Sequence, residues 1–178
     1  WDWLEKEGVT PNPPYIKGNT MSEHTLREKY QSILAKYPAS IAAPTASLHF
    51  TDRLLKKLEK EHIARTEITL HVGAGTFSPI DDSNLKKGKL FTEFYDLSHG
   101  STQAINKAIA DGIPIIPVGT TAMRTLESCA RNNRGDTFQS QGVASVISGA
   151  GSTDIFIYPP YQFKVADALI TNFHVPRS

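Results

Sequence analysis

The chain has 178 residues, of which 39% are hydrophobic and 21% charged, as is ordinary for a globular protein. The net charge of +1 gives no global electrostatic case for nucleic-acid binding, so any such contact must come from a local patch. The single cysteine, Cys129, excludes an internal disulfide framework, and no apolar run approaches the length of a membrane span. We therefore expect a cytoplasmic protein with no membrane contact, in which Cys129 packs inside a helix.

The first part of the chain predicts an extended segment followed by helices and short strands. Residues 1–20 are rich in Pro and Asn, which favours an extended lead-in segment rather than a regular element. Apolar residues at helical spacing predict the helices, and Thr51 is the expected cap of the second. The helices are expected over 22–36 and 52–61, and the strands over 40–44 and 66–72.

The remainder alternates helices with apolar strands. Strands are expected over 91–95, 113–118, 154–158 and 168–173, and helices over 101–111 and 122–132. Gly112 follows one helix in the position of a left-handed cap. The Gly- and Ser-rich residues 133–153 predict a long mobile loop. The nearly all-apolar strand 113–118 is typical of a sheet covered on both faces, so residues 1–178 predict a partial α/β domain. Its sheet should be mainly parallel and flanked by helices, with 113–118 at its centre.

Three histidines share one setting. His49, His71 and His174 are each flanked by apolar residues, where an apolar run meets a Thr, Gly or Pro. Titratable rings at the ends of apolar runs predict a pocket over the edge of a sheet. Each histidine alone is also explained as a hydrogen-bonded core residue. A three-histidine zinc site is a further alternative, but no His-x-x-x-His spacing supports it, so we expect no metal.

The residues that join strand 113–118 to the next helix predict an anion site. Gly119, Thr120 and Thr121 place backbone N–H groups and the positive end of the helix dipole at the end of the strand. The threonines could equally cap the helix. Arg124 opposes the dipole and needs another reason, either an ion pair with Glu127 or a carboxylate or phosphate of a ligand. We expect Arg124 to serve the ligand.

Two further segments carry candidate binding residues. Gly73 and Gly75 follow the strand that carries His71, and Thr76 comes next, but the third glycine of a dinucleotide fingerprint is missing. The glycines indicate either a plain turn or a close approach of the backbone to a ligand, and we favour the ligand. Asn172 shares a strand face with His174, where both could line a pocket or tie down a loop.

Several segments together resemble one family, the S-adenosylmethionine:tRNA ribosyltransferase-isomerases of queuosine synthesis. The order and spacing match over residues 42–51, 69–77, 118–128, 154–159 and 167–178. The chain resembles roughly the second half of these enzymes, and their small β-barrel domain is absent from it. Because the chain starts at Trp1 rather than Met, and stops just after an apolar segment, we expect it to be part of a longer protein.

The resemblance implies an unusual transfer. The family attaches the ribosyl moiety of S-adenosylmethionine to 7-aminomethyl-7-deazaguanine at the tRNA wobble position, giving epoxyqueuosine and releasing adenine and methionine. S-adenosylmethionine is consumed as a substrate, so no cofactor is expected, and the protein is expected to be a monomer. The catalytic residues would be His49, His71 and His174. The substrate-binding residues would be Thr45, Gly73, Gly75, Thr76, Gly119, Thr120, Thr121, Arg124, Glu127 and Asn172.

The sequence departs from the family pattern at a few positions. Two histidines that usually precede the Glu-aromatic-Tyr step are absent from 88–95, and Ser47 and Pro160 each replace a usual glycine. These departures leave two alternatives open. One is a paralogue that binds an adenosine-containing ligand without modifying tRNA, and the other is a transferase that uses S-adenosylmethionine on a small molecule.

Overall fold

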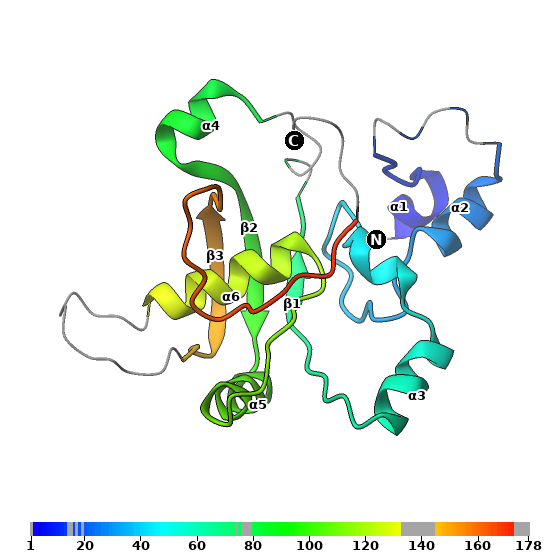
Figure 1. Cartoon of the computed structure of the whole chain (residues 1–178). Helices are drawn as coiled ribbons and strands as arrows, with labels where there is room; N and C mark the ends of the chain where they lie inside the picture. The colour runs from blue at the N-terminus through cyan, green and yellow to red at the C-terminus, as the bar shows by residue number, and fades with distance from the viewer. Residues whose placement is uncertain are drawn as a thin grey trace.

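The structure is a computed structural model and describes residues 2–13, 16, 18, 20–73, 75, 80–132 and 145–172. In this part of the chain the helices and strands follow the order shown in Figure 1. The helices are α1 (Asp2–Glu7), α2 (Glu23–Lys29), the 3-10 helix η1 (Thr45–His49), α3 (Asp52–Lys60), α4 (Asp82–Lys87), α5 (His99–Ala110) and α6 (Thr120–Asn132). The strands are β1 (Thr69–His71), β2 (Lys89–Leu97) and β3 (Gly149–Ile155).

The three strands form an antiparallel sheet in the order β1-β2-β3. Leu70 of β1 lies opposite Tyr95 of β2, which in turn lies opposite Gly151 of β3. The described residues are compatible with an α/β domain, but they do not show the mainly parallel sheet that the sequence predicted. The described residues form one parallel pairing, an isolated bridge between Val118 and Ile170 that lies outside this sheet.

The prediction that residues 113–118 form a central strand covered on both faces is wrong. Ile113 and Ile116 are 54% and 50% exposed, and the segment forms no ladder within the described residues. Pro114 and Pro117 have no N–H to donate, which limits pairing along this stretch. The backbone N–H of Ile170 does donate to the Pro117 carbonyl (3.0 Å), so the parallel pairing of this segment is limited to one isolated bridge within the described residues.

Strand β3 lies largely inside the predicted mobile loop 133–153, of which residues 133–144 fall outside the described part. The glycines of this strand hid it from pattern analysis. Gly151 packs beneath Tyr95 so closely that a Cβ there would lie 2.7 Å from the phenolic oxygen. A glycine inside a strand therefore marks a close approach here rather than a loop.

The helices follow the sequence expectations in part. Helix α3 begins as predicted, with the Thr51 hydroxyl accepting from the Leu54 N–H (3.2 Å), and α5 is followed by Gly112 with φ of +67°. Helix α2 ends at Lys29, well before residue 36. Helix α1 lies in the segment expected to be extended, and α4 was not predicted although Asp81 and Asn84 form a capping box at its start.

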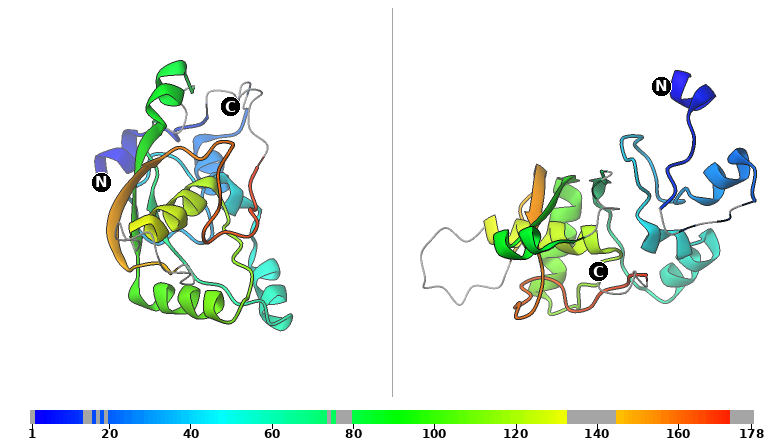
Figure 2. Two further views of the ribbon diagram at one scale, coloured as in Figure 1. Left: turned by 60° about the vertical axis from the view of Figure 1, so that its left-hand side comes forward. Right: turned by 90° about the horizontal axis from the view of Figure 1, so that it is seen from above.

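Helix α6 lies between two layers. One of its sides faces the sheet, and residues 160–172 run along its other side (Figure 1; Figure 2, right). The buried core draws on the sheet, α5, α6 and the segment that follows β3. Its members are Tyr95, Leu97, Ile105, Leu126, Cys129, Ala130, Val146 and Val165. Cys129 is 1% exposed, which confirms the prediction that it is a packing residue on the buried face of a helix.

Among the described residues, none of the helices combines the length and the apolar character that crossing a membrane requires.

Candidate functional site

Two predicted site residues that are distant in sequence meet in space. His49, in η1, lies with its Nε2 2.6 Å from Oδ1 of Asn172. An amide oxygen can only accept, so His49 Nε2–H donates, and Nδ1 is then the acceptor nitrogen of the neutral ring. Asn172 thereby fixes both the tautomer and the orientation of the ring. His49 is exposed rather than buried, contrary to the expectation from its apolar neighbours.

The turn that starts α6 lies between η1, which carries His49, and the segment that carries Asn172. Gly119 has φ of +96°, and a Cβ built on it would lie 3.9 Å from the Ala46 Cβ, so η1 packs against this turn. The Gly119 N–H donates to the Ile170 carbonyl (2.8 Å). Helix η1, the start of α6 and residues 170–172 are therefore neighbours, although 70 residues of sequence separate η1 from α6.

The end of β1 joins this arrangement through the segment that leads into η1. The N–H groups of Ile41 and Ala42 donate to the Val72 carbonyl (2.9 and 3.3 Å). The Ser40 hydroxyl donates to the Leu70 carbonyl (3.1 Å) and accepts from the Val72 N–H (3.2 Å). We call residues 40–49, 71–73, 118–121 and 170–172 the site cluster. Four of the five segments that suggested the family contribute to it.

His71 lies at the end of β1 in this cluster. Its Nδ1 is buried and has no hydrogen-bond partner among the described residues. A buried imidazole nitrogen without a hydrogen-bond partner is costly, which suits a group that contacts a ligand. His174 and Thr76 lie outside the described residues, so the convergence of all three histidines stays a prediction.

The two predicted glycines behave differently. Added to Gly73, a Cβ would meet no atom within 4 Å. At Gly75 a Cβ would lie 2.6 Å from the ring of Phe91, so this glycine allows close packing of the backbone on an aromatic side chain. The structure thus gives Gly75 a packing reason that does not require a ligand.

The side chain of Arg124 is used within the protein, on two strands of the sheet. Its guanidinium forms a buried ion pair with Glu93 of β2 and donates to the carbonyls of Ile155 (2.9 Å), Phe91 (2.9 Å) and Thr153 (3.3 Å). Each of its three nitrogens is thereby used on β2 or β3. Burial lowers the pKa of Arg124, opposed by the charge of Glu93. These contacts make Arg124 a link between α6 and two strands, and its predicted ligand role stays untested.

Glu127 does not pair with Arg124, contrary to one of the sequence alternatives. Its carboxylate is fully buried and accepts from the Tyr161 hydroxyl (3.1 Å) and from the N–H groups of Lys164, Val165 and Ala166 (3.0 Å each). Glu127 therefore fixes the segment that leads directly to residues 170–172. These contacts give Glu127 a positioning role behind the site cluster, and its predicted contact with substrate stays a prediction.

Glu93 is the residue that sequence reasoning missed. One carboxylate oxygen pairs with Arg124, and the other accepts from the Thr121 hydroxyl (3.1 Å), so Thr121 serves Glu93 rather than the helix end. A signal was present, because Glu93 shares the inward face of β2 with Tyr95 and Leu97. A buried acid needs a cation, and Arg124 was a cation without an explanation.

Five other ionisable groups among the described residues have shifted pKa values. Hydrogen bonds from Thr10 and Ser83 lower the pKa of Glu23 and of Asp81, respectively. Burial raises the pKa of Tyr95 to about 12 and also raises that of the Cys129 thiol, to which Tyr95 is hydrogen-bonded. A hydrogen bond from Lys89 (2.6 Å) lowers the pKa of Asp154. None of these groups belongs to the site cluster, so the shifts concern stability rather than chemistry.

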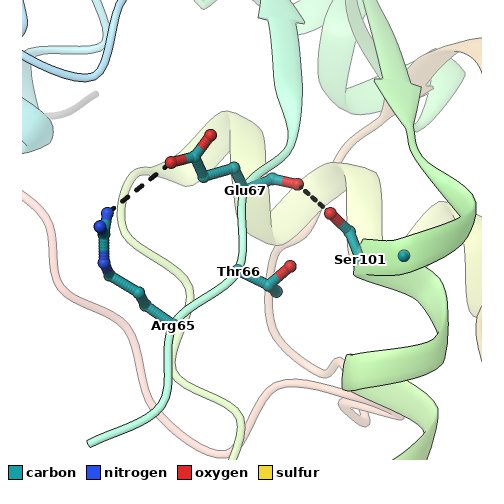
Figure 3. A pocket seen from close by; sticks show the side chains of 5 residues that line it. Arg65, Thr66, Glu67 and Ser101 are labelled. Atoms are coloured by element: carbon teal, nitrogen blue, oxygen red, sulfur yellow. Dashed lines mark hydrogen bonds and ion pairs between the residues drawn. The ribbon is translucent and has the colours of Figure 1, made fainter. Parts of the chain in front are cut away.

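A pocket of about 370 Å³ lies elsewhere, between residues 65–67 and the start of α5 (Figure 3). Within it the Ser101 hydroxyl donates to the Glu67 carbonyl (2.6 Å) and Arg65 pairs with Glu67 (3.7 Å). None of the predicted site residues lines this pocket. Among the described residues, no group of three His, Cys, Asp or Glu side chains lies close enough to hold a metal ion.

Comparison with known families matches the chain along its whole length. A family model described as "Queuosine biosynthesis protein" covers residues 1–178. The chain belongs to this family. Its relatives are named S-adenosylmethionine:tRNA ribosyltransferase-isomerase. The one from Treponema denticola is 44% identical over 177 residues, which are 99% of this chain and 48% of the relative.

Two further relatives carry the same name. The relative from Thermotoga petrophila is 43% identical over 97% of the chain, and that from Vesicomyosocius okutanii is 43% identical over the whole chain. These matches cover 47% and 48% of the respective relatives. The chain thus spans about half the length of the curated relatives it matches. The family predicted from the sequence is confirmed.

Proposed function

We propose that the protein transfers and isomerises the ribosyl moiety of S-adenosylmethionine onto 7-aminomethyl-7-deazaguanine at the tRNA wobble position. The products are epoxyqueuosine-tRNA, adenine and methionine, and S-adenosylmethionine is consumed as a substrate. The observation that carries the proposal is the 42–44% identity, over nearly the whole chain, to relatives named for this transfer. The contact between His49 and Asn172 supports it, because it joins two of the matching segments at one place.

The reaction requires a base that removes a proton from the carbon beside the sulfonium, and groups that assist the loss of adenine. His49, with Nδ1 left as an acceptor, and His71, with an unpartnered buried Nδ1, have the chemistry of such bases. We assign the same class of role to His174. The start of α6 at Thr120 offers backbone N–H groups and a positive dipole end to the methionine carboxylate or a tRNA phosphate. Gly119, whose own N–H is used on the Ile170 carbonyl, supplies the turn that precedes them.

The remaining predicted site residues bind or position the substrate in this proposal. Asn172 orients His49, Thr45 begins η1, and Gly73 lies at the open end of β1. Gly75 and Thr76 follow Gly73 closely in the sequence and are assigned the same role. Thr121, Arg124 and Glu127 hold the start of α6 and residues 161–166 in place through Glu93 and the buried carboxylate of Glu127. We further propose a monomer that works on tRNA in the cytoplasm.

A chimera tests the proposed function. The chain replaces the segment to which it aligns in the Thermotoga petrophila relative, and the chimera is expressed in a cell that lacks its own ribosyltransferase-isomerase. Mass spectrometry of tRNA nucleosides should then detect epoxyqueuosine or queuosine. Accumulation of the unmodified aminomethyl-deazaguanine, with a folded chimera present, would contradict the proposal. The unaltered relative is the positive control.

One departure favours a second candidate. The stretch 88–95 holds no histidine, whereas the family resemblance led us to expect two. A paralogue that binds an adenosine-containing ligand without modifying tRNA would explain that loss. In that case the chimera should bind S-adenosylmethionine in calorimetry but release no adenine on addition of tRNA.

A further inference from the structure

Helix α3 has two chemically opposite faces. At about 100° per residue, Arg53, Lys56, Lys57 and Lys60 fall within about 100° of arc. Leu54, Leu55 and Leu58 occupy the opposite side and are half-buried, while all four cations are exposed. We call these four cations the basic stripe. The helix therefore packs through its leucines and presents its positive charge outward.

The basic stripe differs from six other cations among the described residues in having no counter-ion. Across the described residues, acidic groups pair with Arg27, Lys36, Arg65, Lys89, Lys107 and Arg124. In the same part of the chain no ion pair or hydrogen bond is formed by the stripe's side chains, although Asp52 and Glu59 lie on the same helix. Four like charges held on one face without partners repel one another, so their grouping is unfavourable for the isolated chain.

The basic stripe is also placed next to the site cluster. Thr51 caps α3 two residues after His49, so the helix starts directly at the end of η1. Nine residues extend about 13 Å, which keeps every cation of the stripe within a short reach of η1. In both views α3 lies at the periphery of the molecule beside η1 and covers no face of the sheet (Figure 1; Figure 2, right).

We propose that the basic stripe of α3 binds the phosphate backbone of the tRNA substrate and holds the RNA beside the site cluster. This inference rests on the proposed function, since the relatives' name supplies the RNA. The argument is charge complementarity: a row of unpaired cations matches a polyanion, and binding RNA releases the counter-ions condensed on it. With a net charge of +1 for the whole chain, a local patch is the way to create such an attraction.

The test compares two triple variants of the 178-residue chain. The stripe variant carries Lys56→Gln, Lys57→Gln and Lys60→Gln, and the control carries Lys29→Gln, Lys86→Gln and Lys87→Gln, which are exposed on α2 and α4. Both lose three charges, and Gln has nearly the helix propensity of Lys, so circular dichroism should be unchanged in each. Affinity for an unmodified tRNA transcript is measured by fluorescence anisotropy between about 50 and 200 mM salt.

The stripe variant should bind tRNA at least tenfold more weakly at about 100 mM salt. The magnitude of the slope of log K against log salt should fall by about 2 to 3, for three lost phosphate contacts. The control should stay within twofold of the parent. An equal effect of both variants, no effect of either, or no tRNA binding by the parent would overturn the proposal. The proposal would also be overturned if the stripe variant kept the parent's affinity for tRNA but lost binding to phosphatidylserine vesicles. Failure of the proposed function would instead appear as missing epoxyqueuosine in the chimera, which is a separate readout.

Discussion

Arg124 of α6 and Glu93 of β2 form an ion pair in which both side chains are buried, at 9% and 4% exposure. Glu93 also accepts from Thr121, and Arg124 also donates to carbonyls of β2 and β3. The pair thus fixes the first turns of α6 against the sheet. Because the Gly119 turn directly precedes those turns, the ion pair positions one wall of the site cluster.

Arg124→Met should destabilise the protein by about 3–5 kcal/mol, because it leaves the Glu93 carboxylate buried without its partner. The free energy of unfolding in urea measures this loss. Arg53→Met, on the exposed basic stripe, is the matched control and should change stability by less than about 0.5 kcal/mol. Unchanged stability together with weaker S-adenosylmethionine binding would restore the ligand role that the sequence suggested for Arg124.

Glu127→Gln should lower stability by on the order of 3 kcal/mol. In the parent the Tyr161 hydroxyl and the backbone N–H groups of 164–166 all donate to this carboxylate. The amide of Gln replaces one acceptor oxygen with an NH2 group, which faces these donors without a partner. Urea unfolding gives the loss, and Glu59→Gln on the exposed side of α3 controls for the removed charge. If the two variants unfold at the same urea concentration, Glu127 does not hold this segment.

Stability should fall at alkaline pH because of Tyr95. Its folded pKa of about 12 lies above the ordinary value near 10, so the unfolded chain loses the phenolic proton first. The contribution of the protonated Tyr95 to the free energy of unfolding is complete below about pH 10 and disappears as the pH rises through about 12. Tyr95→Phe should flatten the difference in urea midpoints between pH 9 and pH 11. Tyr37→Phe, at an exposed position, should leave the parent's pH dependence intact.

Local chemistry made several elements predictable. Helices α3 and α5 form as expected, because the residues that specify them lie within one or two turns of the helix they affect. These residues are Thr51 and the leucines for α3, and Gly112 for α5. The strand predicted over residues 91–95 is likewise the middle of β2. The family followed from segments whose spacing survives in the chain, and the site cluster reunites most of them.

Long-range contacts were not predictable in the same way. Strand β3 pairs with β2 where Gly151 leaves room for the ring of Tyr95, a contact across more than 50 residues that no local pattern reveals. Residues 113–118 have the composition of a central strand, but Pro114 and Pro117 prevent a full ladder. The role of Glu93 needed the knowledge that Arg124 lies opposite it.

The most direct test of the site is the rate of adenine release by the purified chimera with S-adenosylmethionine and tRNA, for His49→Ala and Asn172→Ala. Loss of a base or of its orientation should reduce the rate at least a hundredfold in His49→Ala and at least tenfold in Asn172→Ala, with tRNA affinity within twofold of the parent. His24→Ala, at an exposed position on α2, should release adenine at the parental rate. Parental rates in both site variants would contradict the assignment of the reaction to the place where η1 meets residues 170–172.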